Sequence, residues 1–190
     1  MTFFCSMNKF LLTLAVVFAL CFTACAQKKT NMGTSKVLVT YFSGTGTTTK
    51  VARDIADVSG GELFEIMPQN PYTDADLNWN NKQSRSSIEM GDATSRPALK
   101  NKKGNIADYD IIFIGYPIWW NLAPRIINTF IEEHDLKGKA IIPFATSGGS
   151  GISNSVSALK ESYPTLNWKE GKLLNRASRN AIREWIVLYQ

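Results

Sequence analysis

From Lys36 onward, the chain alternates between short apolar runs and segments in which apolar residues recur every three or four positions. The short runs are typical of buried strands and lie at residues 37–42, 62–67, 110–116 and 140–146. Helical spacing is found at residues 47–58, 124–133, 152–163 and 178–188. Parallel strands need a long crossover between them, usually a helix, so this alternation favours a parallel sheet with helices on both faces. With a short fifth strand at Leu173 and Leu174, we predict one α/β domain over residues 36–190.

The most specific motif is the loop between the first strand and the first helix, which reads Ser43-Gly44-Thr45-Gly46-Thr47-Thr48. Its glycines allow the backbone to approach a ligand closely, and the helix N-terminus adds a partial positive charge. The hydroxyl groups of its serine and threonines are further donors. Because Thr49 stands where a P-loop and a dinucleotide-binding loop both require glycine, the pattern fits neither motif. We predict a phosphate-binding loop; the alternative is a tight turn rich in small residues.

This loop resembles the phosphate loop of the flavodoxin family. Six residues fall on positions that the family pattern expects, namely Tyr41, Ser43, Gly46, Thr48, Ala52 and Ile55. The resemblance covers residues 36–190 and implies a three-layer α/β sandwich with a five-stranded parallel sheet of order 2-1-3-4-5. In that fold, flavin mononucleotide (FMN) binds at the switch point between strands one and three. The resemblance therefore implies an FMN-binding protein that moves electrons.

Two further loops become candidates for contacts with the flavin ring. The loop after strand three begins with Pro117, Ile118, Trp119 and Trp120. Two adjacent tryptophans are costly in water unless something covers them, so we expect one to stack on the flavin and the other to pack; the alternative places both in the core. After strand four, the family resemblance implies backbone donors near the pyrimidine end of the ring, from Ser147, Gly148, Gly149 and Gly151.

The chain departs from the family pattern in both of these loops. Flavodoxins commonly stack a second aromatic side chain from the loop after strand four, and residues 147–151 contain none. The loop after strand three lacks glycine, although in flavodoxins a peptide there turns over to favour the one-electron-reduced flavin. Positive φ is costly for residues with a Cβ, and Asn121 would tolerate it best. We therefore expect two-electron rather than one-electron behaviour.

The polar segment from Pro68 to Asn105 breaks the alternation of strands and helices. A connection this long within a compact domain usually has a function. We predict a helix over residues 73–90 and expect the segment to lie over the edge of the cofactor.

The first 35 residues have the pattern of an export signal and a tether. Lys9 precedes an uncharged apolar run over residues 10–24, and small residues follow at 24–26. We interpret residues 1–26 as a signal peptide, with Met7 as an alternative start, and residues 27–35 as a polar tether. Cleavage after Ala26 fits ordinary signal peptidase, whereas residues 22–25 resemble a lipobox in which Cys25 is lipidated; an uncleaved anchor is the third alternative. We expect an exported protein, periplasmic or membrane-anchored as a lipoprotein.

The remaining composition restricts other chemistry. All three cysteines lie within the first 25 residues, so the domain itself has no thiol for a disulfide, a metal or a nucleophile. The net charge of +5 is mild and its Lys and Arg residues are scattered, which disfavours a nucleic-acid partner. His134 is the only histidine; we interpret it as a cation at the end of a helix and expect no metal site.

Three functions remain open. The leading hypothesis is a flavodoxin-like electron carrier or small reductase that exchanges electrons with an unidentified protein or small acceptor. The second is an NAD(P)H-dependent quinone or flavin reductase, and the third is a flavin-free binding module of the cell envelope. The sequence shows no recognisable acid, base or substrate pocket, so no catalytic residue is assigned.

The segment before Lys36 carries no strand or helix that the sheet needs, so it should be dispensable for folding. A chain that begins at Lys36 is expected to match the full-length protein in melting temperature and flavin content. Thermal unfolding and the absorbance of the purified protein measure both quantities. An insoluble or flavin-free product would show that the boundary is wrong.

Overall fold

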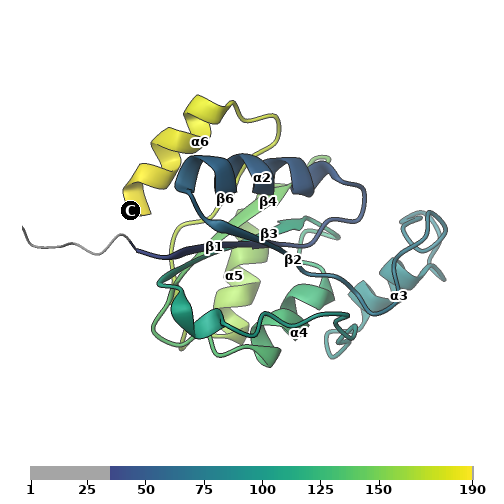
Figure 1. Ribbon diagram of the computed structural model, residues 1–190. Coiled ribbons are helices and arrows are strands. Elements are labelled where there is room, and N and C mark those ends of the chain that lie inside the picture. The colour runs from purple at the N-terminus through teal and green to yellow at the C-terminus, as the bar shows by residue number, and fades with distance from the viewer. Residues whose placement is uncertain (1–34, 190) are drawn as a thin grey trace, which may run out of the picture. The chain divides into compact units, whose positions relative to one another are not determined.

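The computed structural model describes residues 35–189, and its centre is a parallel sheet with helices on both faces (Figure 1). The strands lie in the order β2-β1-β3-β4-β5, with β6 also paired to β4, which confirms the predicted three-layer α/β sandwich and its strand order. The strands are β1 Val37–Tyr41, β2 Glu62–Glu65, β3 Ile111–Pro117, β4 Ala140–Thr146, β5 Asn167–Trp168 and β6 Lys172–Leu173. The α-helices are α2 Thr47–Ser59, α3 Arg85–Gly91, α4 Arg125–Glu133, α5 Ser153–Ser162 and α6 Arg179–Ile186, and the short 3₁₀ helices are Ile106–Asp108 and Val187–Tyr189.

Successive residues of the central strands belong to two different hydrophobic cores. In β1, Val37 and Val39 pack in the core that contains α2 and α6, whereas Leu38 packs in the core that contains α4 and α5. In β3, Phe113 packs in the core with α2 and α6, and Ile114 packs in the core with α4 and α5. Figure 1 shows α2 and α6 on one face of the sheet and α4 and α5 on the other. Burial on both faces explains why these strands are continuous apolar runs in the sequence.

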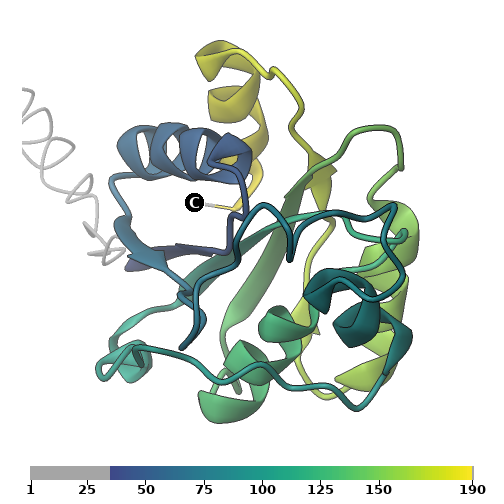
Figure 2. The same cartoon turned by 90° about the vertical axis from the view of Figure 1, so that its right-hand side faces the viewer.

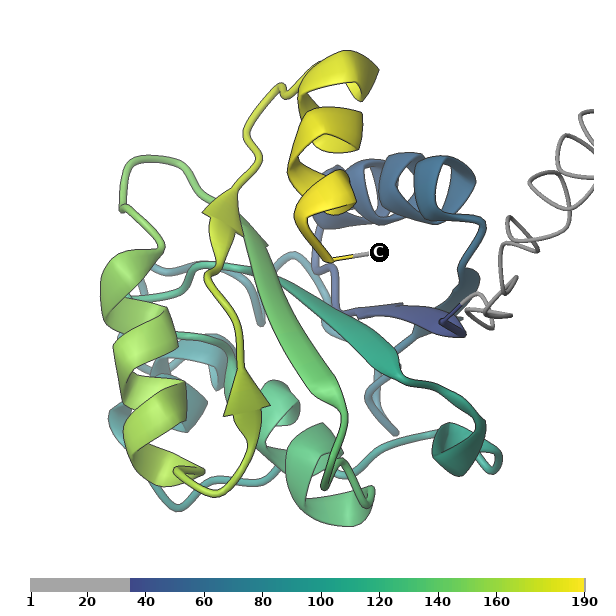
Figure 3. The ribbon, with the colours of Figure 1, turned by 90° about the vertical axis from the view of Figure 1, so that its left-hand side faces the viewer.

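The fifth strand position differs from the prediction, because two short strands share it. Figure 3 shows β5 and β6 as separate pieces beside β4. The Ile141 carbonyl accepts from Lys169 N–H at 2.8 Å and the Ala145 carbonyl accepts from Leu174 N–H at 2.9 Å. Pro143 lies midway between Ile141 and Ala145. Because alternate residues of a strand direct their backbone groups to the same neighbour, Pro143 faces the fifth strand position too, where it has no N–H to donate. The ladder is interrupted there, which divides the strand in two.

The predicted helix over residues 73–90 is wrong for most of its length, since only α3 is helical. The Asp76 carboxylate accepts from Thr73 N–H at 2.9 Å, and the Asn78 side chain accepts from Asn80 N–H at 3.2 Å. Such local side-chain bonds compete with the helical pattern of backbone bonds and favour turns. The helix begins only after Ser84, whose hydroxyl accepts from Ser87 N–H at 3.3 Å and caps the first turn.

Within residues 35–189, no helix is both long and apolar enough to cross a membrane. The predicted signal peptide, the lipobox cysteine Cys25 and most of the predicted tether lie outside the described residues.

Gly115 lies in β3, where a Cβ would come within 2.1 Å of the buried Phe144 ring. Replacing Gly115 with Ala should therefore lower the free energy of unfolding by about 1–3 kcal/mol through overpacking. Gly104→Ala is a matched control, because a Cβ there meets nothing within 4 Å. Urea unfolding of the two variants measures the difference. Equal stabilities would show that the sheet adjusts freely at Gly115.

Candidate functional site

Three of the predicted site loops lie together at one edge of the sheet. The strands β1, β3 and β4 are parallel neighbours, so the loops that follow them leave from the same edge. Register fixes their proximity, because Tyr41 pairs with Gly115 and Pro117 pairs with Thr146. Figure 2 views the molecule from this edge, with the segment around α3 in front. The structure thus brings together the residues predicted from three separate parts of the sequence.

The first loop leaves the N-terminus of α2 open. Gly46 is the N-cap residue with φ +85°, and no side chain caps the helix. Instead, Ser43 Oγ accepts from Gly46 N–H at 3.0 Å, which holds the loop in its turn. Thr45 and Thr47 are exposed, and their hydroxyl oxygens lie 3.4 Å apart. Unsatisfied N–H groups, a helix dipole and adjacent hydroxyls are the arrangement that binds a phosphate group.

Thr48 is placed differently from the other hydroxyl residues of this loop. It is fully buried, and its hydroxyl shares a hydrogen bond of 2.8 Å with the hydroxyl of Thr146 at the end of β4. This bond fastens the first turn of α2 to the central sheet. A direct contact between Thr48 and a phosphate would require Thr146 to be the donor in that bond, because only then is the Thr48 O–H free to donate.

The second loop is a tight hairpin that follows β3. Trp119 N–H donates to Leu122 carbonyl at 3.0 Å and Leu122 N–H donates back to Trp119 carbonyl at 2.9 Å. Both central residues have positive φ, +45° at Trp120 and +65° at Asn121, as a type I′ turn requires. Asn121, the residue expected to tolerate positive φ best, adopts it, and so does Trp120, for which it was not expected. The steric argument for two-electron behaviour loses its premise, because the hairpin bonds hold a tryptophan in this conformation.

The two adjacent tryptophans have different surroundings. Trp119 is partly buried, and its ring meets the rings of Phe42 and Tyr72 edge-on, each with centroids 5.5 Å apart. Trp120 is 47% exposed. Trp119 thus packs, as expected of one of the two, and stacking of the other on the flavin stays a prediction.

The third loop is organised by its own serine and by a residue from beyond β6. Ser147 Oγ accepts from Gly149 N–H at 3.1 Å and from Ser150 N–H at 2.8 Å. The Asn175 side chain accepts from Ser147 N–H at 2.8 Å and donates to its carbonyl at 2.6 Å. Gly148, Gly149 and Gly151 are exposed. Asn175 was missed in the sequence, because nothing local marks an asparagine that clamps a loop 28 residues away.

A cavity of about 600 Å³ lies between the second and third loops. Its size falls in the range of roughly 300–1,000 Å³ that is usual for small-molecule sites. Of the predicted residues, Ile118, Trp119, Trp120, Ser147, Gly148 and Gly149 line it, whereas Pro117 and Gly151 do not. Sequence reasoning missed Leu77, Trp79, Ser86 and Ser150, which complete the lining.

The walls of this cavity lie against the loop over residues 43–48, whose Ser43 and Gly44 line a separate cavity of about 240 Å³. A Cβ on Gly44 would lie 3.3 Å from Leu77 Cδ2 and 3.5 Å from Trp119 Cζ2, both of which belong to residues that line the larger cavity. Another cavity, of about 430 Å³, lies near Lys36 and Tyr109, at the opposite ends of the strands. The aromatic cavity beside the loops is the candidate site, because ligands of open α/β sheets bind at the carboxyl ends of the strands.

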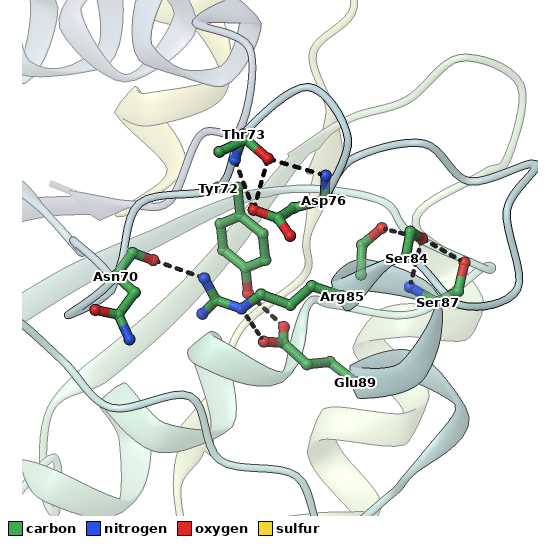
Figure 4. A network of polar contacts seen from close by, with 9 residues as sticks. Asn70, Tyr72, Thr73, Asp76, Ser84, Arg85, Ser87 and Glu89 are labelled. Atoms are coloured by element: carbon green, nitrogen blue, oxygen red, sulfur yellow. Dashed lines mark hydrogen bonds and ion pairs between the residues drawn. The ribbon is translucent and has the colours of Figure 1, made fainter.

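The segment from Pro68 to Asn105 reaches this site and is held by a polar network (Figure 4). The Tyr72 hydroxyl donates to the Glu89 carboxylate, and Arg85 Nε donates to the same carboxylate at 2.6 Å. The Arg85 guanidinium also lies 4.0 Å from the centre of the Tyr72 ring and donates to Asn70 carbonyl at 2.7 Å. Burial, and next the bond to Glu89, raise the pKa of Tyr72 well above its usual value. Tyr72 therefore stays neutral and keeps the segment against Trp119.

The interpretation of His134 as a cation is wrong. Its Nε2 accepts from Lys103 N–H at 3.0 Å, and its Nδ1 lies 2.8 Å from Phe130 carbonyl. These two bonds require a neutral ring with its proton on Nδ1. The histidine joins the segment before β3 to the end of α4, remote from the three loops. Within the described residues, no group of three or more metal-ligating side chains occurs.

Comparison with known proteins agrees with this site. Residues 36–188 match the family described as flavodoxin. The chain belongs to the flavodoxin family. No curated protein gives a significant match.

Three solved structures resemble this flavodoxin domain. A protein from Bacteroides eggerthii assigned as a flavoprotein is 63% identical, over 81% of this chain and 97% of its own, with a TM-score of 0.80. A protein from Bacteroides uniformis, assigned in the same way, is 57% identical over 80% and 98%, with a TM-score of 0.79. A flavoprotein from Lactobacillus acidophilus, solved in complex with FMN, is 25% identical over 73% and 93%, with a TM-score of 0.62.

The residues of the site fit FMN. The uncapped N-terminus of α2, with the exposed hydroxyls of Thr45 and Thr47, suits a phosphate dianion. The adjoining cavity, lined by Trp119, Trp120 and a glycine-rich loop, suits a planar aromatic ring. Gly44 lies next to Leu77 and Trp119 of the cavity wall, so the two parts are close enough for one molecule with a phosphate at one end and a ring at the other.

The buried Thr48–Thr146 bond predicts that a substitution at Thr48 lowers stability more than the same substitution at the exposed Thr47. Thr48→Val leaves the Thr146 hydroxyl buried without its partner, so the free energy of unfolding of the ligand-free protein should fall by about 1–3 kcal/mol. Thr47→Val makes the same chemical change at an exposed position and should alter it by no more than about 0.5 kcal/mol. Urea unfolding without added flavin measures both. Equal losses would show that the bond does not fasten α2 to β4.

Proposed function

We propose that this protein is an FMN-binding redox protein of the flavodoxin type, acting as an electron carrier or a small reductase. The observation that carries the proposal is the uncapped N-terminus of α2 directly beside a cavity lined by tryptophans, at the carboxyl ends of β1, β3 and β4. The family membership and the Lactobacillus acidophilus complex with FMN support the same cofactor. FMN is therefore the cofactor that the chain binds.

The protein supplies binding and orientation, and bound FMN supplies the ability to accept and release electrons. The loop over residues 43–48 holds the phosphate through backbone N–H groups and the hydroxyls of Thr45 and Thr47. Trp119 and Trp120 lie on one side of the space for the ring, and Gly148 and Gly149 present backbone groups to it. The Asn175 clamp fixes that third loop before any ligand arrives, which reduces the entropy lost on binding.

A carrier and a reductase differ in what reduces the flavin. A carrier exchanges electrons with a partner protein, whereas an NAD(P)H-dependent quinone or flavin reductase is reduced directly by the nicotinamide. Oxidation of NADPH and of NADH by the holoprotein, with a quinone as acceptor, separates the two. Turnover that depends on both the quinone and the flavin assigns a reductase, and the absence of turnover assigns a carrier.

The alternative from another class is a flavin-free binding module of the cell envelope. The open helix terminus of α2 argues against it, because a purely structural turn would gain stability from a capping side chain. A purified protein that is colourless and takes up no FMN would favour the module. Absorbance in the flavin bands after addition and removal of excess FMN tests it.

We also propose that the protein is exported, as a periplasmic protein or as a lipoprotein anchored through Cys25. The proposal is supported by the apolar run over residues 10–24 and the small residues that follow it. Cell fractionation of the native protein and of Cys25→Ser separates the alternatives. Loss of membrane association in the variant would assign a lipid anchor, whereas a cytoplasmic native protein would contradict export.

A site built around a phosphate predicts that FMN binds far more tightly than riboflavin. Thr45→Ala removes one hydroxyl bond to a charged group, worth about 1.5–3 kcal/mol, so FMN should bind on the order of 10- to 150-fold more weakly. Riboflavin has no phosphate, and its affinity should be unchanged by the same substitution. Titration of both flavins by fluorescence quenching gives the four dissociation constants. Equal affinity of the unaltered protein for the two flavins would contradict the assignment.

A further inference from the structure

Trp79 is 71% exposed, although it lines the cavity beside the three loops. A tryptophan left in water forgoes the burial of one of the largest apolar side chains. Single exposed apolar residues on a flat surface need no explanation, but Trp79 lies on a concave surface that it shares with Ile118, Trp119 and Trp120. Its position is that of a side chain that a ligand covers.

The backbone that carries Trp79 is held on both sides. On the N-terminal side, Leu77 N–H donates to Thr73 carbonyl at 3.1 Å, and the Leu77 side chain lies close to Gly44 of the phosphate-binding loop. On the C-terminal side, the network of Arg85, Glu89 and Tyr72 anchors the start of α3 (Figure 4). A fixed backbone with an uncovered indole loses little further entropy when a planar group stacks on it.

Without Trp79, aromatic side chains would line the site on one side only. The hairpin after β3 contributes Trp119, whose ring already meets Phe42 and Tyr72, and the half-exposed Trp120. The loop after β4 contributes no aromatic side chain over residues 147–151. Among the residues that line the cavity, Trp79 is the one aromatic side chain that does not come from the hairpin.

We propose that Trp79 is the second aromatic contact of the isoalloxazine ring, supplied by the segment between β2 and α3 instead of by the loop after β4. This inference rests on the proposed binding of FMN. It gives the long polar segment a role, because its network and its packing on Gly44 place an indole at the edge of the ring site.

The inference is tested by Trp79→Ala, Trp79→Phe and Ile88→Ala. Ile88 is a matched control, since it is 56% exposed in the same segment and does not line the cavity. Loss of an aromatic contact should weaken FMN binding by at least about 2- to 12-fold and leave the bound flavin more fluorescent. Trp79→Phe should recover most of the affinity, and Ile88→Ala should bind FMN as the unaltered protein does. Fluorescence titration measures affinity and quenching together.

A second measurement follows the indole itself. The chain has five tryptophans, so protein labelled with 5-fluorotryptophan gives five fluorine signals, and Trp79→Phe identifies the signal of Trp79 by its loss. FMN should shift that signal. The signal of Trp185, a residue of α6 that is buried against Phe113 of the sheet, should not move. The signal of Trp185 is assigned in the same way with Trp185→Phe.

The outcomes separate the inference from the proposed function. If the unaltered protein does not bind FMN, the proposed function fails. If it binds FMN, but Trp79→Ala retains full affinity and quenching and the Trp79 signal does not shift, the inference alone is overturned. Equal losses in Trp79→Ala and Ile88→Ala would also overturn it, because they would show that the segment matters only for its packing.

Discussion

The structure depends on the burial of a parallel sheet on both of its faces. The strands β1, β3 and β4 alternate their side chains between two cores, one shared with α2 and α6 and the other with α4 and α5. Each crossover helix must return the chain to the same end of the sheet, so every loop that follows a central strand emerges at one edge. The close approach of Gly115 to the Phe144 ring shows how tightly the two central strands are packed. Three loops from distant parts of the chain therefore meet on a rigid base.

At that edge, the chain keeps several features that do not favour stability. The helix α2 has no capping side chain, Trp120 lies in a turn with positive φ, and Trp79 is largely exposed. A cap is worth about 0.5–2 kcal/mol and a strained residue costs about 1–3 kcal/mol, so these features are expensive for a domain of this size. They are grouped around one cavity, and bound FMN would relieve two of them by satisfying the helix terminus and covering an indole.

The polar segment between β2 and β3 is fixed by side-chain bonds rather than by regular structure. Its network joins Tyr72, Arg85 and Glu89, and Leu77 fastens it to the phosphate-binding loop at Gly44. The neutral His134 fastens the end of the same connection to α4 through Lys103. An ordered connection can hold a ligand contact at a smaller cost than a mobile one, which would lose entropy on binding. The segment thus belongs to the site as much as the loops do.

The sequence by itself determined the parallel sheet and the glycine- and hydroxyl-rich loop between its first strand and first helix. The sheet follows from apolar runs and helical spacing, whereas the strand order was implied by the resemblance of that loop to the flavodoxin family. Two of its predictions about the fold failed, one through strand pairing with a remote part of the chain and one through local side-chain bonds. Pro143 divides the fifth strand only because of the side of β4 that it faces, and the expected helix over residues 73–90 yields to turns made by Asp76 and Asn78. The bond of Thr48 to Thr146, the bonds of Asn175 to Ser147 and the position of Trp79 in the cavity lining were decided by tertiary structure alone, because each depends on residues that are remote in the sequence.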